Sequence, residues 1–319
     1  EKEEVVRVSV DVPYDLVMNY LFFETITDYK SPAFRYMSKT TIDSYDRLIA
    51  PSIEREMRNI VFDDASEGAI KLFSENLKNL LMTAPLKNKT VLGFDPGYRT
   101  GCKLAVVDRT GKVLDTAVIY PTKPQEKIAE SGAVVKRLIS KYKIDVIAIG
   151  NGTASKESEI FIANLIKEIP EPVRYTMVSE AGASVYSASK LGAEEFPDFD
   201  VTQRSAVSIA RRLQDALAEL VKIDPQSIGV GQYQHDMKLS RLSEALTGVV
   251  EDCVNTVGVD INTASHALLS YVAGINATSA KNIVKYREEN GEFKSRAEIL
   301  KVPRIGGKAY EQCAGLDRK

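Results

Sequence analysis

A single carboxylate, Asp95, ends the apolar run VLGFD and is followed directly by Pro96 and Gly97. Aspartate before Pro-Gly is a favoured turn residue. A carboxylate at the end of a buried strand can also bind a metal ion or lie beside a phosphate group. The choice between these roles depends on which other groups the fold brings to the same place.

Two segments near the C-terminus have the residue spacing of a helix-hairpin-helix motif. The template is Gly-apolar-Gly, followed by Ala and then Ile at fixed intervals. The two copies are Gly274-Ile275-Asn276 with Ala280 and Ile283, and Arg304-Ile305-Gly306 with Tyr310 and Cys313. A hairpin without side-chain bulk lets backbone N–H groups at a helix N-terminus approach phosphate oxygens, so this spacing predicts binding that is independent of base sequence.

Each copy of the motif departs from the template once. Asn276 replaces a glycine, and asparagine tolerates left-handed backbone angles. Arg304 supplies a positive charge at a position that favours glycine. The residues that we expect to contact nucleic acid are Gly274, Asn276, Lys281, Arg304, Gly306, Gly307 and Lys308. The alternative is that the two hairpins serve only as protein-packing units.

The charge of the whole chain does not identify a partner. In 319 residues, 42 Lys and Arg nearly balance 44 Asp and Glu, so no global field attracts nucleic acid or membrane. From residue 270 onward ten basic residues stand against six acidic ones, so the basic surface is local. The three cysteines lie far apart without a CxxC pair, which argues against a disulfide framework or a zinc site and fits a reducing cytoplasm. No apolar run is long enough for a membrane span.

Three regions with different periodicity follow one another along the chain. Residues 1–88 predict a helical support region with a leading strand over 6–12 and a helix with Asp64 as its N-cap. Residues 89–223 predict an α/β domain. Residues 224–319 predict an all-α domain that carries both hairpins. The fold class is therefore multidomain, with an α/β domain between two helical regions.

The middle region begins with three strand-like segments, 90–95, 102–108 and 112–121, which tight turns connect. Helices over 125–142, 156–167 and 201–221 then alternate with strands over 145–151 and 174–180. This order predicts a mixed sheet, antiparallel in its first hairpins and parallel later. No GxGxxG or GxxxxGKS sequence suggests a dinucleotide or nucleotide site.

This strand and helix order resembles the ribonuclease H-like fold, in particular its YqgF branch, which is similar to Holliday-junction resolvases. The resemblance implies carboxylates at the end of the first strand, at a later strand end and on the closing helix. Asp95, Glu180 and Asp215 hold these positions here. Two Mg²⁺ or Mn²⁺ ions bridged by such carboxylates would stabilise both the attacking and the leaving oxygen of a phosphodiester.

Each of these acids also has a structural explanation. Glu180 could cap the following helix, and Asp215 could pair with an arginine of its own helix. Asn151 stands at the end of the fourth strand, where the resolvase relatives have an acid. In a 3-2-1-4-5 sheet, Glu180 would also be one strand removed from Asp95. A catalytic site, a weak metal or phosphate site and a purely structural role all remain open.

The whole chain resembles the Tex family of bacterial transcription accessory proteins. The resemblance rests on long strings that include VLGFDPGYRTGCKLAVVD, SIARRLQDALAELVKIDPQSIGVGQYQHDM and VEDCVNTVGVDINTAS. It implies a cytoplasmic protein that binds RNA or DNA and is linked to the transcription machinery, without a membrane segment or a required cofactor. It also implies helical sequence before residue 1 and an OB-fold RNA-binding module after residue 319.

Two hypotheses about function follow from these features. In the first, the hairpins hold backbone phosphates and the ribonuclease H-like domain is a non-catalytic platform. In the second, the chain is a metal-dependent nuclease that uses Asp95, Glu180 and Asp215. Asn151 at the fourth strand end favours the first hypothesis.

Overall fold

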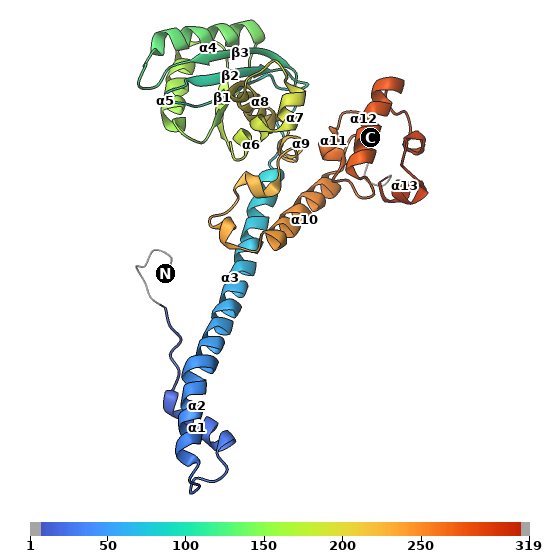
Figure 1. Cartoon of the computed structure of the whole chain (residues 1–319). Coiled ribbons are helices and arrows are strands. Elements are labelled where there is room, and N and C mark those ends of the chain that lie inside the picture. Colours follow the sequence, from blue (N-terminus) through green and yellow to red (C-terminus); the bar gives the residue numbers. More distant parts are fainter. Residues whose placement is uncertain (1–7, 314–319) are drawn as a thin grey trace. The chain divides into compact units, whose positions relative to one another are not determined.

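The computed structural model describes residues 8–313, and they fall into two compact units, Glu1–Ile70 and Lys71–Lys319. The first unit contains helices at the N-terminal end of the chain, and the second contains the sheet and the C-terminal helices (Figure 1). Helix α3 (Ala50–Leu81) begins in the first unit and ends in the second.

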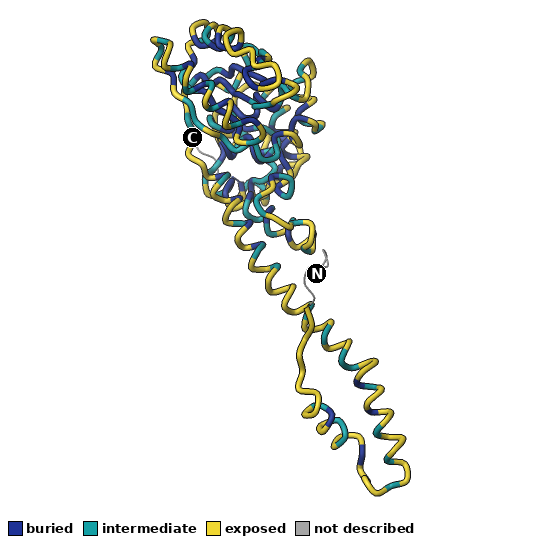
Figure 2. Tube along the Cα trace, turned by 90° about the vertical axis from the view of Figure 1, so that its left-hand side faces the viewer, coloured by how far each residue is buried: buried dark blue, intermediate teal, exposed yellow. Residues whose placement is uncertain are grey.

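Helices form all the regular structure of the first unit that the structure describes. They are α1 (Tyr14–Thr25), α2 (Phe34–Ser44), the π-helical turn η1 (Tyr45–Ile49) and the beginning of α3. Thr25 and Thr41 hydrogen-bond between α1 and α2, and the ring of Tyr14 meets the ring of Tyr45 edge-on. Much of this unit is exposed along its trace (Figure 2).

Two predictions for the first region were wrong in detail. Residues 8–12 form no strand, because no described strand lies beside them and an unpaired strand is not stable; residues 6 and 7 lie outside the described part. Asp64 is no N-cap, since it lies in the middle of the 32-residue helix α3. Helix-forming sequence continues on both sides of Asp64, and this outweighs its local capping pattern.

The second unit is built on a five-stranded sheet with the order β3-β2-β1-β4-β5. Its strands are β1 (Val91–Asp95), β2 (Cys102–Val107), β3 (Val113–Ile119), β4 (Val146–Gly150) and β5 (Arg174–Val178). The first three strands pair antiparallel, whereas β1 with β4 and β4 with β5 pair parallel. The predicted mixed sheet and its strand order are confirmed.

Helices cover both faces of this sheet. On one face lie α4 (Ile128–Tyr142) and α5 (Ser155–Leu165), which the 3₁₀ turn η2 (Ile166–Glu168) follows, and on the other lies α8 (Val201–Gln214). Helices α6 (Ala183–Ala188) and α9 (Ala216–Leu220) pack against α8, and α7 (Lys190–Glu195) packs against α6. The helix predicted over 201–221 is thus interrupted at Asp215, whose backbone is extended (φ −156°, ψ 97°). Its side chain accepts a hydrogen bond from the N–H of Ala218, so it caps α9.

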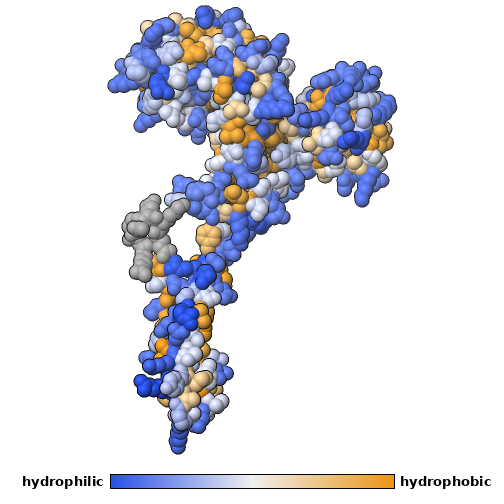
Figure 3. Space-filling view, viewed as in Figure 1, coloured by the Kyte–Doolittle hydropathy of each residue, from blue (hydrophilic) through white to orange (hydrophobic). Residues whose placement is uncertain are grey.

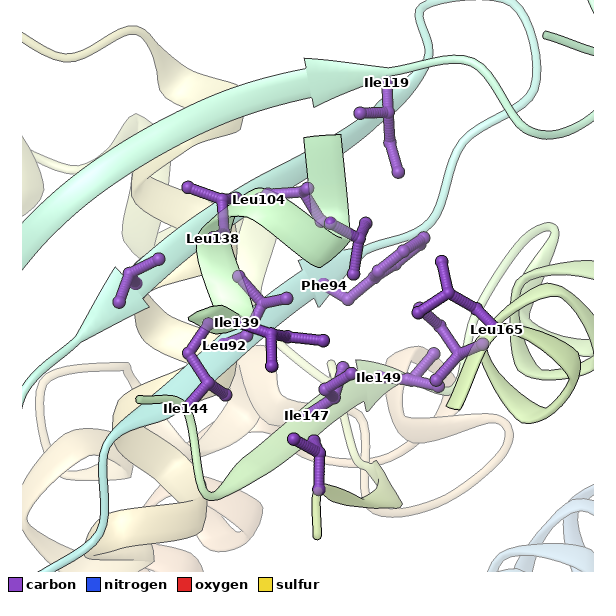
Figure 4. Packing of buried hydrophobic residues seen from close by; sticks show 14 of the residues in the cluster. Leu92, Phe94, Leu104, Ile119, Leu138, Ile139, Ile144, Ile147, Ile149 and Leu165 are labelled. Carbon is purple, nitrogen blue, oxygen red and sulfur yellow. The ribbon is translucent and has the colours of Figure 1, made fainter. Parts of the chain in front are cut away.

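Alternating residues of β1 divide the core into two layers. Leu92 and Phe94 pack with residues of α4 and α5, including Leu138, Ile139 and Leu165 (Figure 4). On the opposite face, Val91 packs with residues of α8. Gly93 lets α8 come close, because a Cβ there would lie 2.1 Å from the carbonyl oxygen of Ala206. The first strand is therefore fixed from both sides, and so is Asp95 at its end.

The C-terminal part of the second unit is helical, as predicted. Its elements are the 3₁₀ turns η3 (Pro225–Ile228) and η4 (Gln234–Asp236), α10 (Leu239–Val257), α11 (His266–Leu269), α12 (Ala277–Asn290), the 3₁₀ turn η5 (Arg296–Lys301) and α13 (Gly307–Cys313). Gly291, with φ +85°, follows α12 and ends it.

Candidate nucleic-acid interface and the carboxylate end of the sheet

Asp95 lies at the carboxyl end of β1, in a largely buried and polar environment. Lys103 is its cross-strand partner on β2, and Ser205 of α8 hydrogen-bonds to the carboxylate. The pKa of Asp95 is raised to about 6, mainly by burial and in smaller part by the charge of Glu180, against the hydrogen bond from Ser205 and the charge of Lys103, which both lower it. An acid with this pKa changes its charge close to neutral pH.

Glu180 reaches toward Asp95 even though it follows the fifth strand. Its carboxylate lies over the end of β4, where a Cβ on Gly152 would be 1.6 Å from Oε1 and a Cβ on Gly150 would be 2.6 Å from Oε2. The strand order had suggested that β4 would separate Glu180 from Asp95. The glycines at the end of β4 instead leave room for the Glu180 carboxylate on the side of Asp95. Asn151 supports this arrangement, because its Oδ1 accepts a hydrogen bond from the backbone N–H of Glu180 (3.1 Å).

Asp215 does not join the other two acids. Ser205, which contacts Asp95, lies ten residues before Asp215, and this separation corresponds to about 15 Å along a helix. Asp215 instead caps α9 at the opposite end of α8. The position that faces Asp95 from α8 is a serine, so the arrangement lacks the third carboxylate that the resemblance implied.

Arg212 is the main charged group buried behind Glu180. Its side chain is only 4% exposed, and its Nη1 donates to the carbonyl oxygens of Ser179 (2.9 Å) and Ala181 (2.7 Å). Burial lowers the pKa of Arg212 to about 10, against the opposing effects of Glu219 and Glu180. Among the residues that the structure describes, three buried atoms have no hydrogen-bond partner: Glu180 Oε2, Arg212 Nη2 and Glu219 Oε1.

These residues fit a two-metal centre poorly. In the described part of the chain, no three His, Cys, Asp or Glu side chains gather closely enough to hold a metal ion. The ammonium group of Lys103 already places a positive charge beside Asp95. Lys103, Ser205 and Arg212 were not predicted from the sequence. Lys103 could have been found from the antiparallel register of β1 and β2, which places it opposite Asp95. The roles of Ser205 and Arg212 depend on how α8 packs, which the sequence does not show.

The first hairpin connects α11 to α12. Gly274 has the left-handed backbone angle (φ +80°), whereas Asn276 is extended and caps α12 by accepting a hydrogen bond from the N–H of Ser279 (2.9 Å). The expectation that Asn276 would adopt a left-handed conformation was therefore wrong. Ile275 is buried and anchors the loop. The first backbone N–H groups of α12 have no acceptor within the helix.

The second hairpin repeats this geometry with a different residue at the strained position. Arg304 has φ +68°, where the first hairpin has Gly274, and Ile305 is buried as Ile275 is. Gly306 and Gly307 then lead into α13, and among residues 8–313 no atom beyond the adjoining backbone lies within 4 Å of a Cβ built on either residue. The loop therefore leaves open space at the start of the helix.

The two hairpins pack against each other. The side-chain amide of Asn282 on α12 donates to the carbonyl oxygen of Pro303 (2.9 Å), just before the second loop. In the opposite direction, Gly274 lies against α13, where a Cβ would be 2.8 Å from the carbonyl oxygen of Ala309. Ala280 and Ile283 are fully buried between them, as the motif requires.

The residues expected to contact nucleic acid lie on the surface of the paired hairpins. Every member of that set is exposed: Gly274, Asn276, Lys281, Arg304, Gly306, Gly307 and Lys308. Within residues 8–313, none of the basic side chains of Lys281, Arg304 and Lys308 forms an ion pair. The visible surface of the domain is largely hydrophilic, with small apolar patches (Figure 3).

Fold and site together define a class of protein in which a ribonuclease H-like YqgF domain is combined with a helix-hairpin-helix domain. Residues 89–214 match the Tex protein YqgF-like domain, and residues 254–316 match the helix-hairpin-helix motif. The chain belongs to the Tex family.

Relatives with substantial identity come from bacteria and animals. The uncharacterized protein YdcI of Bacillus subtilis is 54% identical over 318 residues, which cover 100% of this chain and 44% of YdcI. Protein tex of Bordetella pertussis is 53% identical, over 90% of this chain and 36% of its own. The human S1 RNA-binding domain-containing protein 1 is 47% identical, over 86% of this chain and 28% of its own. The chain thus spans less than half the length of these relatives.

The structure also bears on membrane insertion. Within residues 8–313, no helix combines the length and the apolar character needed to cross a bilayer.

Proposed function

We propose that this chain is the nucleic-acid-binding part of a cytoplasmic transcription accessory factor, and that it holds backbone phosphates without reading base sequence. The observation that carries the proposal is the pair of hairpins, each of which leads an exposed loop into a helix N-terminus, with open space around Gly306 and Gly307 in the second one. Backbone N–H groups at such a terminus, together with the helix dipole, attract phosphate oxygens.

Three exposed basic side chains lie in or close to these loops. Lys281 is on the second turn of α12, Arg304 is in the second loop and Lys308 is on the first turn of α13. Contacts of this kind release counterions from the nucleic acid, so affinity should fall steeply with salt concentration. They carry no sequence information, so different sequences should bind alike.

The test is a salt series of polarisation measurements with labelled oligonucleotides of different sequence. Lys308→Glu should weaken all sequences alike and reduce the log–log salt slope by about 0.7 for single strands or about 0.9 for duplex DNA. Lys285→Glu is the matched control, because it makes the same charge change on α12 at a lysine that is paired with Glu289. Equal effects of both variants would indicate a general charge effect and not a contact.

A second variant tests the backbone contact itself. Gly306→Val should weaken binding without changing the charge, because the side chain would occupy the open space in front of the helix. Gly248→Val on α10 is the control, since a Cβ on that glycine also meets no described atom within 4 Å. If folded Gly306→Val and Lys308→Glu both bind like the parent, the hairpins are packing units and the proposal is wrong.

In this proposal the ribonuclease H-like domain is a platform without nuclease activity. The missing third carboxylate beside Asp95 and the presence of Lys103 support this view. We expect no cleavage of single-stranded or branched DNA above background in Mg²⁺ or Mn²⁺. Reproducible cleavage that disappears in Asp95→Asn would establish the nuclease alternative instead.

The longer protein should add further contacts. We infer that it carries an OB-fold RNA-binding module after residue 319 and that it acts together with the transcription machinery. The names of two relatives support this inference, since one is called a transcriptional accessory protein and another is named for an S1 RNA-binding domain. Binding measured with residues 1–319 alone should therefore be weaker than binding by the longer protein.

A further inference from the structure

The loop between η3 and α10 displays two aromatic rings at the surface. Tyr233 is 67% exposed, and the side chain of His235 is 74% exposed. The centroids of the two rings are 6.5 Å apart, and their planes are tilted by 50°. Neither ring is part of a hydrophobic core, so packing does not account for them.

Tyr233 has a backbone conformation that is unusual for its residue type. Its φ is +60° and its ψ is +26°, in the left-handed region. Bulky residues rarely adopt this conformation, and such strain persists where surrounding contacts enforce it and where the side chain has a role. Glycine would be easier to accommodate here, yet the chain places an aromatic ring at this point.

Contacts with neighbouring elements hold the loop in this conformation. The side chain of Gln234 accepts from the N–H of Gly231 (3.2 Å) and donates to the carbonyl oxygen of Gln226 (3.0 Å). Gly231 packs directly on the ring of Phe73 on α3, where a Cβ would lie 1.9 Å from the ring. The rings are thus presented from an ordered loop, and little conformational freedom is lost when something stacks on them.

We propose that Tyr233, with His235 beside it, is a stacking platform for the bases of a single-stranded nucleic acid; this rests on the proposed function above. An aromatic ring can stack on any base, so such a platform needs no sequence preference. Duplex bases are already stacked on their neighbours, so the platform would favour single strands.

The charges around the rings agree with contact to a base. Asp236 lies beside His235, with 3.4 Å between Oδ1 and Nε2, and its carboxylate disfavours a phosphate at that point. We therefore assign base contact to the rings and phosphate contact to the hairpins.

The test compares a normal single strand with an abasic strand of the same length, which has the phosphates but no bases. Tyr233→Gly should weaken binding of the normal strand roughly 5- to 150-fold and leave the abasic strand unchanged. Tyr233→Phe, which keeps the ring, should bind like the parent. Because glycine adopts a positive φ without strain, Tyr233→Gly should melt at the same temperature as the parent or higher.

The other outcomes separate this proposal from the one on which it rests. If Tyr233→Gly weakens normal and abasic strands equally, the ring does not contact bases and the platform is wrong. If Tyr233→Gly binds like the parent while Lys308→Glu weakens binding, phosphate binding stands and the platform fails. If Tyr233→Gly, Lys308→Glu and Gly306→Val all bind like the parent, both proposals fail, and a protein partner becomes the better explanation for the exposed rings.

Discussion

The carboxylate end of the sheet and the hairpin loops both combine charged residues with glycines, but they use them in opposite ways. At the sheet, Gly150 and Gly152 make room for another side chain of the same chain, the carboxylate of Glu180. At the second hairpin, Gly306 and Gly307 leave open space that no described atom fills. The first pair of glycines serves internal packing, and the second pair leaves the surface free for a ligand.

The arginines of the two regions also differ in whether their charge is satisfied within the protein. Arg212 is buried and donates to two backbone carbonyl groups, so its charge is used within the domain. Arg304 is exposed, and its side chain has no ion-pair partner among residues 8–313. Glycines and charges near one another therefore do not by themselves indicate a binding site. Whether the groups are satisfied inside the protein distinguishes the two cases.

The largest expected difference between the regions concerns stability. Arg212→Met keeps most of the side-chain length but leaves Glu180 and Glu219 without the guanidinium group beside them. Removing one member of a buried charge group typically costs about 3–5 kcal/mol, and we expect that loss in the free energy of unfolding measured with denaturant. Arg304→Met, the matched exposed control, should change it by less than about 0.5 kcal/mol. Equal effects would show that burial does not separate the two regions.

A smaller effect, of opposite sign, is expected from Asp95. Because its pKa is about 6 in the folded protein, against an ordinary value of 3.8, the folded protein binds the proton more tightly than the unfolded chain does. Ionisation of Asp95 therefore destabilises the fold as the pH rises through this interval. A tenfold change in acid dissociation constant corresponds to about 1.4 kcal/mol. Asp95→Asn should raise the free energy of unfolding by roughly 1–3 kcal/mol at about pH 8 and change it little at about pH 4.

Asp145 provides a control with the opposite sign. Burial alone would raise its pKa, but hydrogen bonds from the N–H of Thr90 and from Lys89 together lower it. Asp145→Asn should therefore destabilise the protein at about pH 8, and less so at low pH, in the same denaturation series. If Asp95→Asn also lowers the free energy of unfolding at the higher pH, the surroundings stabilise the ionised carboxylate of Asp95. The interpretation that burial disfavours this ionised form is then wrong.

The sheet could be predicted from sequence because its signals are local. Apolar segments and tight turns predicted the strands, the order of strands and helices predicted a mixed sheet, and the resemblance to the ribonuclease H-like fold implied the order 3-2-1-4-5. The helix ends were less predictable. Asp64 and Asp215 both have the residue type of a cap, but Asp64 lies inside α3, whereas Asp215 interrupts a helix that periodicity had predicted to continue. Tertiary packing decided between these outcomes, and one sequence does not show it.

The surroundings of Asp95 were the least predictable part. The charge of Glu180 acts on Asp95 because two glycines at the end of β4 leave room for its carboxylate, and Ser205 faces Asp95 because α8 lies close over Gly93. Both contacts join segments that are far apart in the sequence, and neither has a local pattern. In the hairpins, by contrast, the motif spacing alone identified the loops. There the structure corrected only which residue takes the left-handed angle.

Arg304→Gly has a small expected effect on stability, and it tests whether the exposed Arg304 differs in role from the buried Arg212. Arg304 has φ +68°, and a left-handed conformation costs a residue other than glycine about 1–2 kcal/mol. Glycine removes that cost but makes the unfolded chain more flexible, by about 0.5–1 kcal/mol. Arg304→Gly should therefore raise the free energy of unfolding by roughly 0.5–1 kcal/mol. The same variant loses one phosphate-seeking charge, so its salt slope for a single strand should fall by about 0.7.

If Arg304→Gly gains stability but loses affinity, Arg304 serves the contact with phosphate and does not stabilise the fold. Arg304→Asn separates the two effects, since asparagine tolerates the left-handed conformation but carries no charge. It should bind as weakly as Arg304→Gly, with a stability between that variant and the parent. The measurements are denaturant unfolding and the polarisation salt series on the same preparations. If Arg304→Gly gains stability and binds with an unchanged salt slope, the exposed arginine does not contact phosphate, and the contrast between the hairpins and the sheet end is one of exposure alone.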